Sequence, residues 1–448
     1  MRYKDVSQFI YSYTLVFTAF VTLVSCSGAG SGDLPPVVGP NPNPQPEEVM
    51  DPKVFLGQSL FFDKILSGEN NISCSTCHGV DHGLGDASSL SLGAGAHGSG
   101  PSRQVTLQTQ GVTGRNTPHL YNIGELQNIS PLFHDGRVQR LGNGQITTPV
   151  GNNLPFGLDD LVAVQALFPL VSQVEMSGEP SASLVGTLVA NGDLNGAWNA
   201  IAQKIRSIPQ YASLFMQAYP TEIFSSSDIQ IRHVANALSS FQKTAFVSKG
   251  APIDRFLQGQ NDAINQQQAD GWELFSGAAN CTSCHAGTLF TDGQFHVVAL
   301  PQLGPIANSN SGDVGREFVT GSSQDRYRFR TPSLKNVKQT GPWGHNGSVK
   351  NLSTMIIAHF DPARAMFMIQ QEGISGSSQQ HNSLMQDFKI FDTQANNFVL
   401  SHHQSAVPQL NDFEVELLVD FLGTMTDSRL NKIKDWKPVN VPSGLSID

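Results

Sequence analysis

Two short segments of the chain place two thiols and an imidazole at fixed spacing. They are Cys74–His78 (CSTCH) and Cys281–His285 (CTSCH), and both read CxxCH. Thiols at this spacing can form thioether bonds with the two vinyl groups of one porphyrin, and the adjacent His then lies beneath the iron as a ligand. We therefore predict two covalently bound haem c groups. The predicted attachment residues are Cys74, Cys77, Cys281 and Cys284, and the predicted proximal ligands are His78 and His285.

Two other interpretations of a CxxC pair are half of a zinc site and a redox dithiol. A structural zinc ion needs four ligands, so a zinc site would need more cysteines than the two that each CxxC pair supplies. A redox dithiol does not require the adjacent His. The fifth cysteine, Cys26, has a separate explanation, so no pair is left for a structural disulfide.

The composition favours short helices joined by long loops. The 448 residues are enough for two or three domains, only 14% are charged, and there are 42 Gly and 25 Pro. The formal net charge of −10 makes nucleic acid an unsuitable partner. A basic or locally complementary redox protein is compatible with it, although net charge alone does not identify one.

The first fifty residues have the pattern of an export signal followed by a tether. Arg2 and Lys4 precede an apolar run at 14–24 that is too short for a standard membrane span. Cys26 ends a lipobox-like segment, so we expect residues 1–26 to be a lipoprotein signal peptide and Cys26 to be acylated. The alternative is an ordinary signal peptide with an incidental Cys. Residues 27–50 are rich in Gly, Pro, Ser and Asn and predict a flexible tether. We expect it to hold the folded protein in the periplasm, close to the outer membrane.

The remaining chain predicts a mainly α fold with two haem domains, at 51–250 and 251–448. Residues 79–115 carry no periodic pattern and predict a long loop over the first haem. Asp228 is predicted to cap a helix through Phe241, and further helices are expected at Ile264–Phe275, 351–360 and Asn411–Gly423. In the last of these we expect Phe413, Leu417 and Phe421 to share one face, and Gly423 to be the C-cap.

Six further segments, taken in order, give the chain a family resemblance. They are Arg115–Pro118, Phe133–Arg137, Val174–Met176, Asp313–Arg316, Arg330–Asn336 and Gly341–Gly347. With the two CxxCH motifs they resemble the bacterial di-haem cytochrome c peroxidase family, which includes a methylamine-utilisation branch that oxidises a partner protein. The resemblance covers roughly residues 51–425.

This resemblance implies two cytochrome c-like domains with long loops and insertions, and a calcium ion between them. It implies that the first haem reacts with hydrogen peroxide and that Glu175 acts there as a general acid–base. Calcium would be bound by Asn116, Thr340 and Pro342. The alternatives are a surface role for Glu175 and a turn-capping role for Asn116. Relatives take electrons from a small cytochrome or copper protein, and many form homodimers.

Two positions depart from the family pattern. His134 replaces a Trp that relays electrons between the haems, so this chain is expected to use another route or to let His134 bind a propionate. The sixth ligand of the second haem falls on His359 by spacing, with Met355 and Met366 as alternatives. His97, in a Gly-rich loop, is the candidate removable ligand of the first haem, and His82 is the weaker candidate. We interpret the remaining His residues, including His119 and His403, as ordinary.

Three functions follow from these residues. The first is reduction of hydrogen peroxide with electrons from a small periplasmic redox protein. The second is oxidation of a partner protein by a specialised di-haem enzyme. The third is a non-catalytic di-haem electron carrier, which would be favoured if both irons were permanently six-coordinate.

Overall fold

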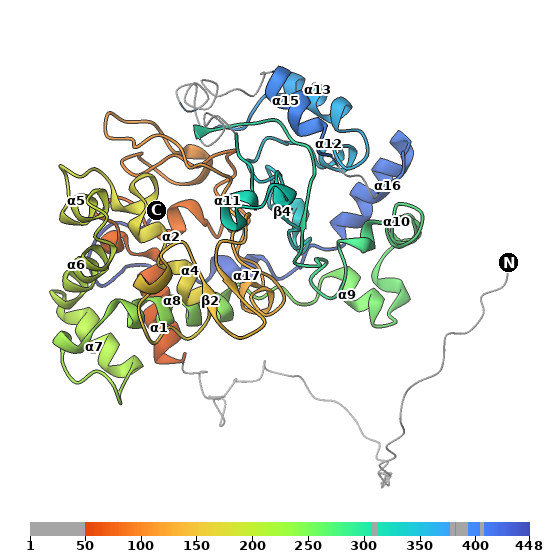
Figure 1. Ribbon diagram of the computed structural model, residues 1–448. Helices are drawn as coiled ribbons and strands as arrows, with labels where there is room; N and C mark the ends of the chain where they lie inside the picture. Colours follow the sequence, from red (N-terminus) through yellow and green to blue (C-terminus); the bar gives the residue numbers. More distant parts are fainter. Residues whose placement is uncertain (1–49, 306–311, 377–380, 382–392, 404–406) are drawn as a thin grey trace, which may run out of the picture. The chain divides into compact units, whose positions relative to one another are not determined.

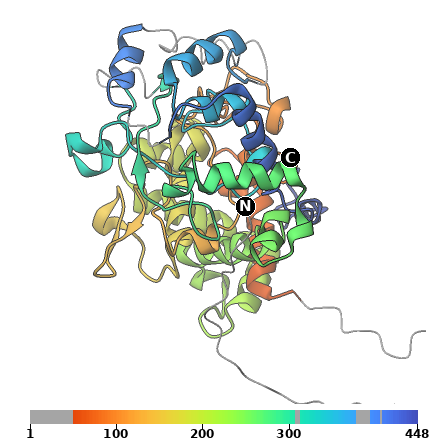
Figure 2. The ribbon, with the colours of Figure 1, turned by 90° about the vertical axis from the view of Figure 1, so that its right-hand side faces the viewer.

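The computed structural model describes residues 50–305, 312–376, 381, 393–403 and 407–448. The predicted signal peptide, the acylation site at Cys26 and all of the predicted tether except Met50 lie outside these residues. No helix in these ranges is long and apolar enough to cross a bilayer. Residues 50–448 form one unit (Figures 1 and 2).

Short helices dominate both halves, as the composition predicts. The first half contains α1 (Pro52–Phe62), α2 (Cys74–Cys77), α3 (Ile123–Leu126), α4 (Leu161–Ala166), α5 (Leu184–Ala190), α6 (Leu194–Arg206), α7 (Pro209–Ala218) and α8 (Ile231–Ala245). The second contains α9 (Pro252–Leu257), α10 (Gln266–Ser276), α11 (Glu317–Thr320), α12 (Leu352–Ile357), α13 (Pro362–Glu372), α15 (Thr393–Leu400), α16 (Asp412–Gly423) and α17 (Asn431–Lys434).

Strands are confined to two small two-stranded pairs in the described part of the chain. β1 (Gln139–Arg140) pairs antiparallel with β2 (Ile146–Thr147), and β3 (Phe295–His296) pairs antiparallel with β4 (Phe329–Arg330). The predicted loop at 79–115 contains one short 3-10 turn, Gly100–Ser102, and isolated bridges such as that between Leu92 and Val112. The mainly helical class is confirmed.

The first core is built where α1 packs on α8. Gly57 of α1 allows this close approach, since a Cβ there would lie 2.0 Å from the carbonyl oxygen of Ala237. Phe61 then packs against Phe241 and Phe246, each with ring centroids 5.3 Å apart. Burial of several aromatic side chains in one cluster supplies much of the stability of this half.

The second core is built where α10 packs on α16. Phe275 and Phe421 have ring centroids 5.0 Å apart, and Trp272 lies 5.7 Å from Phe421. Figure 1 shows α9, α10 and α16 together, on the other side of the unit from α5, α6 and α7.

Two local expectations about helices were wrong. Asp228 is the last residue of a separate 3-10 turn (Ser226–Asp228), and Gln230 is the N-cap of α8. In α16 the buried face consists of Val415, Leu418, Phe421 and Leu422, whereas Phe413 is 71% exposed, and the C-cap is Thr424. Phe413, Leu417 and Phe421 are spaced four residues apart. This spacing does not identify the buried face of a helix that is apolar over most of its length.

The last residues of the chain pack on the first core. Ile433 and Val441 belong to that hydrophobic cluster, and Trp436 contacts Phe241 with ring centroids 5.7 Å apart. The carboxylate of Asp448 pairs with Lys64 at 2.5 Å and accepts a hydrogen bond from Thr76 of α2. The division into domains at residue 250 remains a prediction, and these contacts show that residues 433–448 are packed with the first half.

Arg115 connects segments from both halves through buried ion pairs. Its guanidinium donates to both carboxylate oxygens of Asp313, at 2.8 and 2.7 Å, and to Asp135 at 2.6 Å. All three side chains are at most 8% exposed. Such a bidentate pair fixes relative orientation as well as charge.

Candidate functional site

The first CxxCH motif forms the short helix α2 and the residue that follows it. Ser73 and Thr76 form a capping box at its start. His78 follows the helix, and its Nδ1 donates to the carbonyl of Leu84 at 3.0 Å, which leaves Nε2 as the ligand atom. Burial lowers the pKa of His78 to about 4, so the imidazole is neutral as ligation requires.

The second motif repeats this arrangement on a 3-10 turn, Cys281–Ser283. The Nδ1 of His285 donates to the carbonyl of Phe290 at 3.0 Å, and burial lowers its pKa to about 4. In both halves the proximal ring is therefore held by a backbone carbonyl five or six residues further along.

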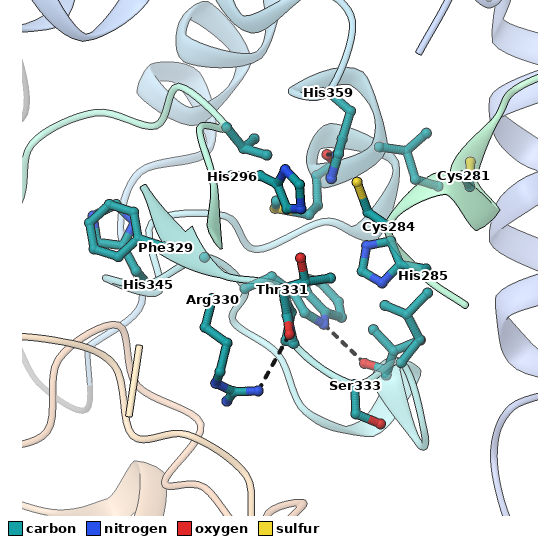
Figure 3. Close-up of a pocket in the computed structure, with 18 of the residues that line it drawn as sticks. Cys281, Cys284, His285, His296, Phe329, Arg330, Thr331, Ser333, His345 and His359 are labelled. Carbon is teal, nitrogen blue, oxygen red and sulfur yellow. Dashed lines mark hydrogen bonds between the residues drawn. The ribbon is translucent and has the colours of Figure 1, made fainter. Parts of the chain in front are cut away.

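A large cavity opens beside the second motif (Figure 3). Cys281, Cys284 and His285 line it together with His359. The rings of His285 and His359 have centroids 6.5 Å apart. Two iron–nitrogen bonds of about 2 Å, as in other metal–imidazole bonds, place two imidazole centroids about 6 Å apart, so this spacing fits one iron between them.

His359 is oriented for this role by its own helix. Its Nδ1 donates to the carbonyl of Met355 at 2.8 Å, and burial lowers its pKa. Met355 also lines the cavity, whereas Met366 packs in a separate cluster with Tyr327 and Val399. Of the three candidate sixth ligands, His359 is therefore the one whose ring faces His285.

Arg330 gives an independent indication that the cavity is made for an anionic group. Its guanidinium lines the cavity and donates only to the carbonyls of Phe133 and Thr331, at 3.2 and 3.4 Å, among the described residues. Burial lowers its pKa to about 10. A cation removed from water needs a counter-charge, and the propionates of a haem would supply one. The residues present fit a haem c.

The chain is similar to known proteins that carry haem c. The family described as di-haem cytochrome c peroxidase matches residues 51–262. The methylamine utilization protein MauG of Methylophilus methylotrophus is 30% identical over 373 residues, which cover 80% of this chain and 87% of that protein. The chain belongs to the di-haem cytochrome c peroxidase family. It is therefore an oxidoreductase that carries two haem c groups.

Other members of this family are similar to the chain at lower identity. The cytochrome c551 peroxidase of Pseudomonas aeruginosa is 28% identical over 301 residues, covering 67% of this chain and 69% of that protein. A crystal structure of a MauG-like protein associated with microbial copper homeostasis has the same fold. Its TM-score is 0.52 at 23% identity, over 90% of this chain and 97% of that one.

Glu175 lies on a one-turn π-helix, Gln173–Ser177, that begins at Ser172. It is near enough to the Cys77 thiol of the first motif to act on its charge, and burial raises the pKa of Glu175 above the ordinary value. The positive charge of Arg137 opposes this rise. A half-buried carboxyl with a raised pKa beside an attachment cysteine is suited to proton transfer.

The two candidate sixth ligands of the first haem lie on the loop at 79–115. His97 is exposed, and its backbone pairs with that of Gln104 at 3.0 and 2.8 Å. His82 is half-buried, and a Cβ on Gly100 would lie 2.3 Å from its ring. Neither ring is placed opposite His78 in the way that His359 is placed opposite His285.

His134 and the predicted calcium ligands line the cavity beside the second CxxCH motif. His134 donates through Nε2 to the carbonyl of Asn116 at 2.9 Å, and burial lowers its pKa to about 3. Thr340 and Pro342 line the same cavity. The structure thus brings Asn116, Thr340 and Pro342 to one place, and a calcium role for them remains a proposal.

Two residues of the cavity are not identified by the sequence patterns above. Arg330 appears there only within the segment Arg330–Asn336, and His119 is interpreted as ordinary. His119 lines the cavity, its Nε2 lies 3.4 Å from the carbonyl of Ser333, and its Nδ1 is buried without a hydrogen-bond partner. Its position directly after Asn116–Pro118 was the available hint.

Proposed function

We propose that this protein reduces hydrogen peroxide to water at its first haem, with electrons that enter from a small redox protein. The proposal rests on a difference between the side chains that surround the two CxxCH motifs. The second site opposes His285 with a second imidazole 6.5 Å away. The first has a proton-holding carboxyl, Glu175, near Cys77.

The haem bound at His78 would supply an iron that binds peroxide and delivers electrons to it. Glu175 would accept the proton of one peroxide oxygen and return it to the other. The second oxygen then leaves as water, and two protons and two electrons balance the reduction of one peroxide to two waters. Burial raises the pKa of Glu175 above the ordinary value, which makes its carboxyl easier to protonate and suits it to accept and return a proton.

The second site would store and pass on an electron. The side chains of His285 and His359 would both hold its iron and would leave no position there for peroxide. Replacing Met by a second His lowers the potential of a c-type haem. Asn116, Thr340 and Pro342 would hold calcium beside this site, and His134 would occupy the place of the inter-haem relay.

Stopped-flow mixing with hydrogen peroxide tests this proposal. We expect fast oxidation of the haems and catalytic turnover of a small cytochrome c or copper-protein donor. Slow bleaching without turnover would refute it. Electron paramagnetic resonance of the oxidised and half-reduced protein should show one low-spin haem that stays closed and one haem that can open, whereas two closed haems in every state would indicate an electron carrier.

A second candidate function is oxidation of a partner protein. It is favoured by the 30% identity to proteins named MauG and by His134 in place of Trp. A long-lived oxidised state after peroxide addition, with no rapid donor turnover, would support it over the first.

The cellular setting is part of the same proposal. We propose a periplasmic enzyme that is held to a membrane by an acyl group on Cys26 and forms a homodimer in solution. Labelling with a fatty acid analogue should modify the wild-type protein and fail to modify a Cys26→Ser variant.

A further inference from the structure

Arg103 is a fully buried cation that none of the roles above uses. It is 1% exposed and lies on the long loop that follows the first CxxCH motif. Among the described residues it forms no ion pair with a carboxylate. Its guanidinium donates to the carbonyls of Leu92 and Gly93, the latter at 3.0 Å, and its Nε is buried without a partner.

The guanidinium of Arg103 lies against the first haem attachment. Its Nη1 is 3.7 Å from the Sγ of Cys77. Cys77 would be bonded to a vinyl carbon, and the propionates of a haem are on the opposite edge of the porphyrin. The charge of Arg330 at the second site can be neutralised by haem propionates. Arg103 lies at the attachment edge of the first haem, where no propionate neutralises its charge.

Three other titratable groups act on this region. Asp86 is buried, lies within range of the charge of Arg103, and accepts hydrogen bonds from Ser88 and Ser91. Asp86 and Glu175 both act on Cys77 with a charge opposite to that of Arg103, and burial raises the pKa of both carboxyls, which favours their neutral forms. The charge of Arg103 also acts on His381. Among the described residues none of the three forms an ion pair with the guanidinium, so its positive charge remains beside Cys77.

A buried unpaired Arg is costly and rare. A positive charge near an iron in a medium of low polarity favours the ferrous over the ferric state, because it disfavours the additional positive charge of the ferric iron. We infer that Arg103 is a positioning residue that raises the reduction potential of the first haem through its charge. This rests on the proposed function only in taking the first haem as the reactive one.

Potentiometric titration of the holoprotein, with each haem followed by its own spectroscopic signal, tests this inference. We expect Arg103→Gln to lower the midpoint potential of the first haem and to leave that of the second unchanged. Arg103→Lys keeps the charge and loses the paired carbonyl contacts, so its potential should remain close to that of the wild type. Arg140→Gln, at an exposed Arg that donates to the Gly144 carbonyl, is the matched control.

The outcomes are separable. An unchanged midpoint potential of the first haem in Arg103→Gln would overturn the inference. Equal shifts in Arg103→Gln and Arg103→Lys would also overturn it, because a purely structural role of Arg103 would be lost alike in both variants. Arg103→Met is a second neutral variant should Gln at this position prevent haem retention. Failure of the peroxidase proposal would appear in peroxide turnover of the wild type, which this titration does not use.

Discussion

The imidazoles of His285 and His359 face each other across the second cavity, with ring centroids 6.5 Å apart and planes inclined at 61°. Each ring is held through Nδ1 by a carbonyl, that of Phe290 or that of Met355. The two rings are thereby oriented so that they would both hold one haem iron.

Replacing His359 with Ala should open the second haem. We expect its low-spin signal to be replaced by a high-spin one and carbon monoxide to bind the reduced protein. Added imidazole should restore the low-spin signal. His359→Met should keep six-coordination and raise the midpoint potential of this haem. Retention of the low-spin signal in His359→Ala would assign the sixth ligand to Met355 or another residue.

Removing the carboxyl of Glu175 should slow the peroxide reaction without loss of the haems. Positioned acid–base groups contribute about 10²–10⁴-fold, so Glu175→Gln should reduce the rate of haem oxidation by a factor in this range. The exposed Glu179→Gln, four residues away, is the control. Because burial raises the pKa of Glu175, the wild-type rate should fall on acidification at a pH above the ordinary Glu value. A wild-type rate in Glu175→Gln would contradict its role.

Breaking the buried ion pairs of Arg115 should destabilise the folded protein. Loss of one partner of a buried pair leaves the other charge uncompensated, at a cost of about 3–5 kcal/mol. We expect Arg115→Ala to lower the melting temperature strongly. Arg364→Ala breaks the exposed pair with Asp412 and should cost at most about 1 kcal/mol. If both variants lower the melting temperature by a similar small amount, the ion pairs of Arg115 do not contribute strongly to the stability of the folded protein.

His119 should make the protein less stable in acid. Burial lowers its pKa in the folded state to about 4, from 6.5. The unfolded chain therefore binds more protons between these values, and stability rises with pH across this window and is lost as pH falls through it. The contribution is at most about 3 kcal/mol. Urea unfolding of the holoprotein gives its free energy of unfolding at pH 4.5 and at pH 7. The difference between these two free energies should be smaller for His119→Asn than for the wild type.

Local spacing is enough to predict the two haem attachments, because each CxxCH motif lies within five residues. His359 follows only from the family resemblance, by its distance from His345, and its role as a ligand remains a prediction. Pattern alone does not show which side of an apolar helix meets the core, so it places Phe413 on the buried face, whereas this side chain is exposed. The burial of Arg103 cannot be predicted from the sequence, since it depends on how a loop without periodicity folds back on Cys77.

The contacts of residues 433–448 have a consequence for connectivity. Because Ile433 and Val441 complete the first core, the second haem half is topologically an insertion within the first. The first core therefore lacks these side chains until the last residues of the chain have been synthesised. A fragment that stops before residue 426 should expose apolar surface and aggregate even though it contains Cys74–His78.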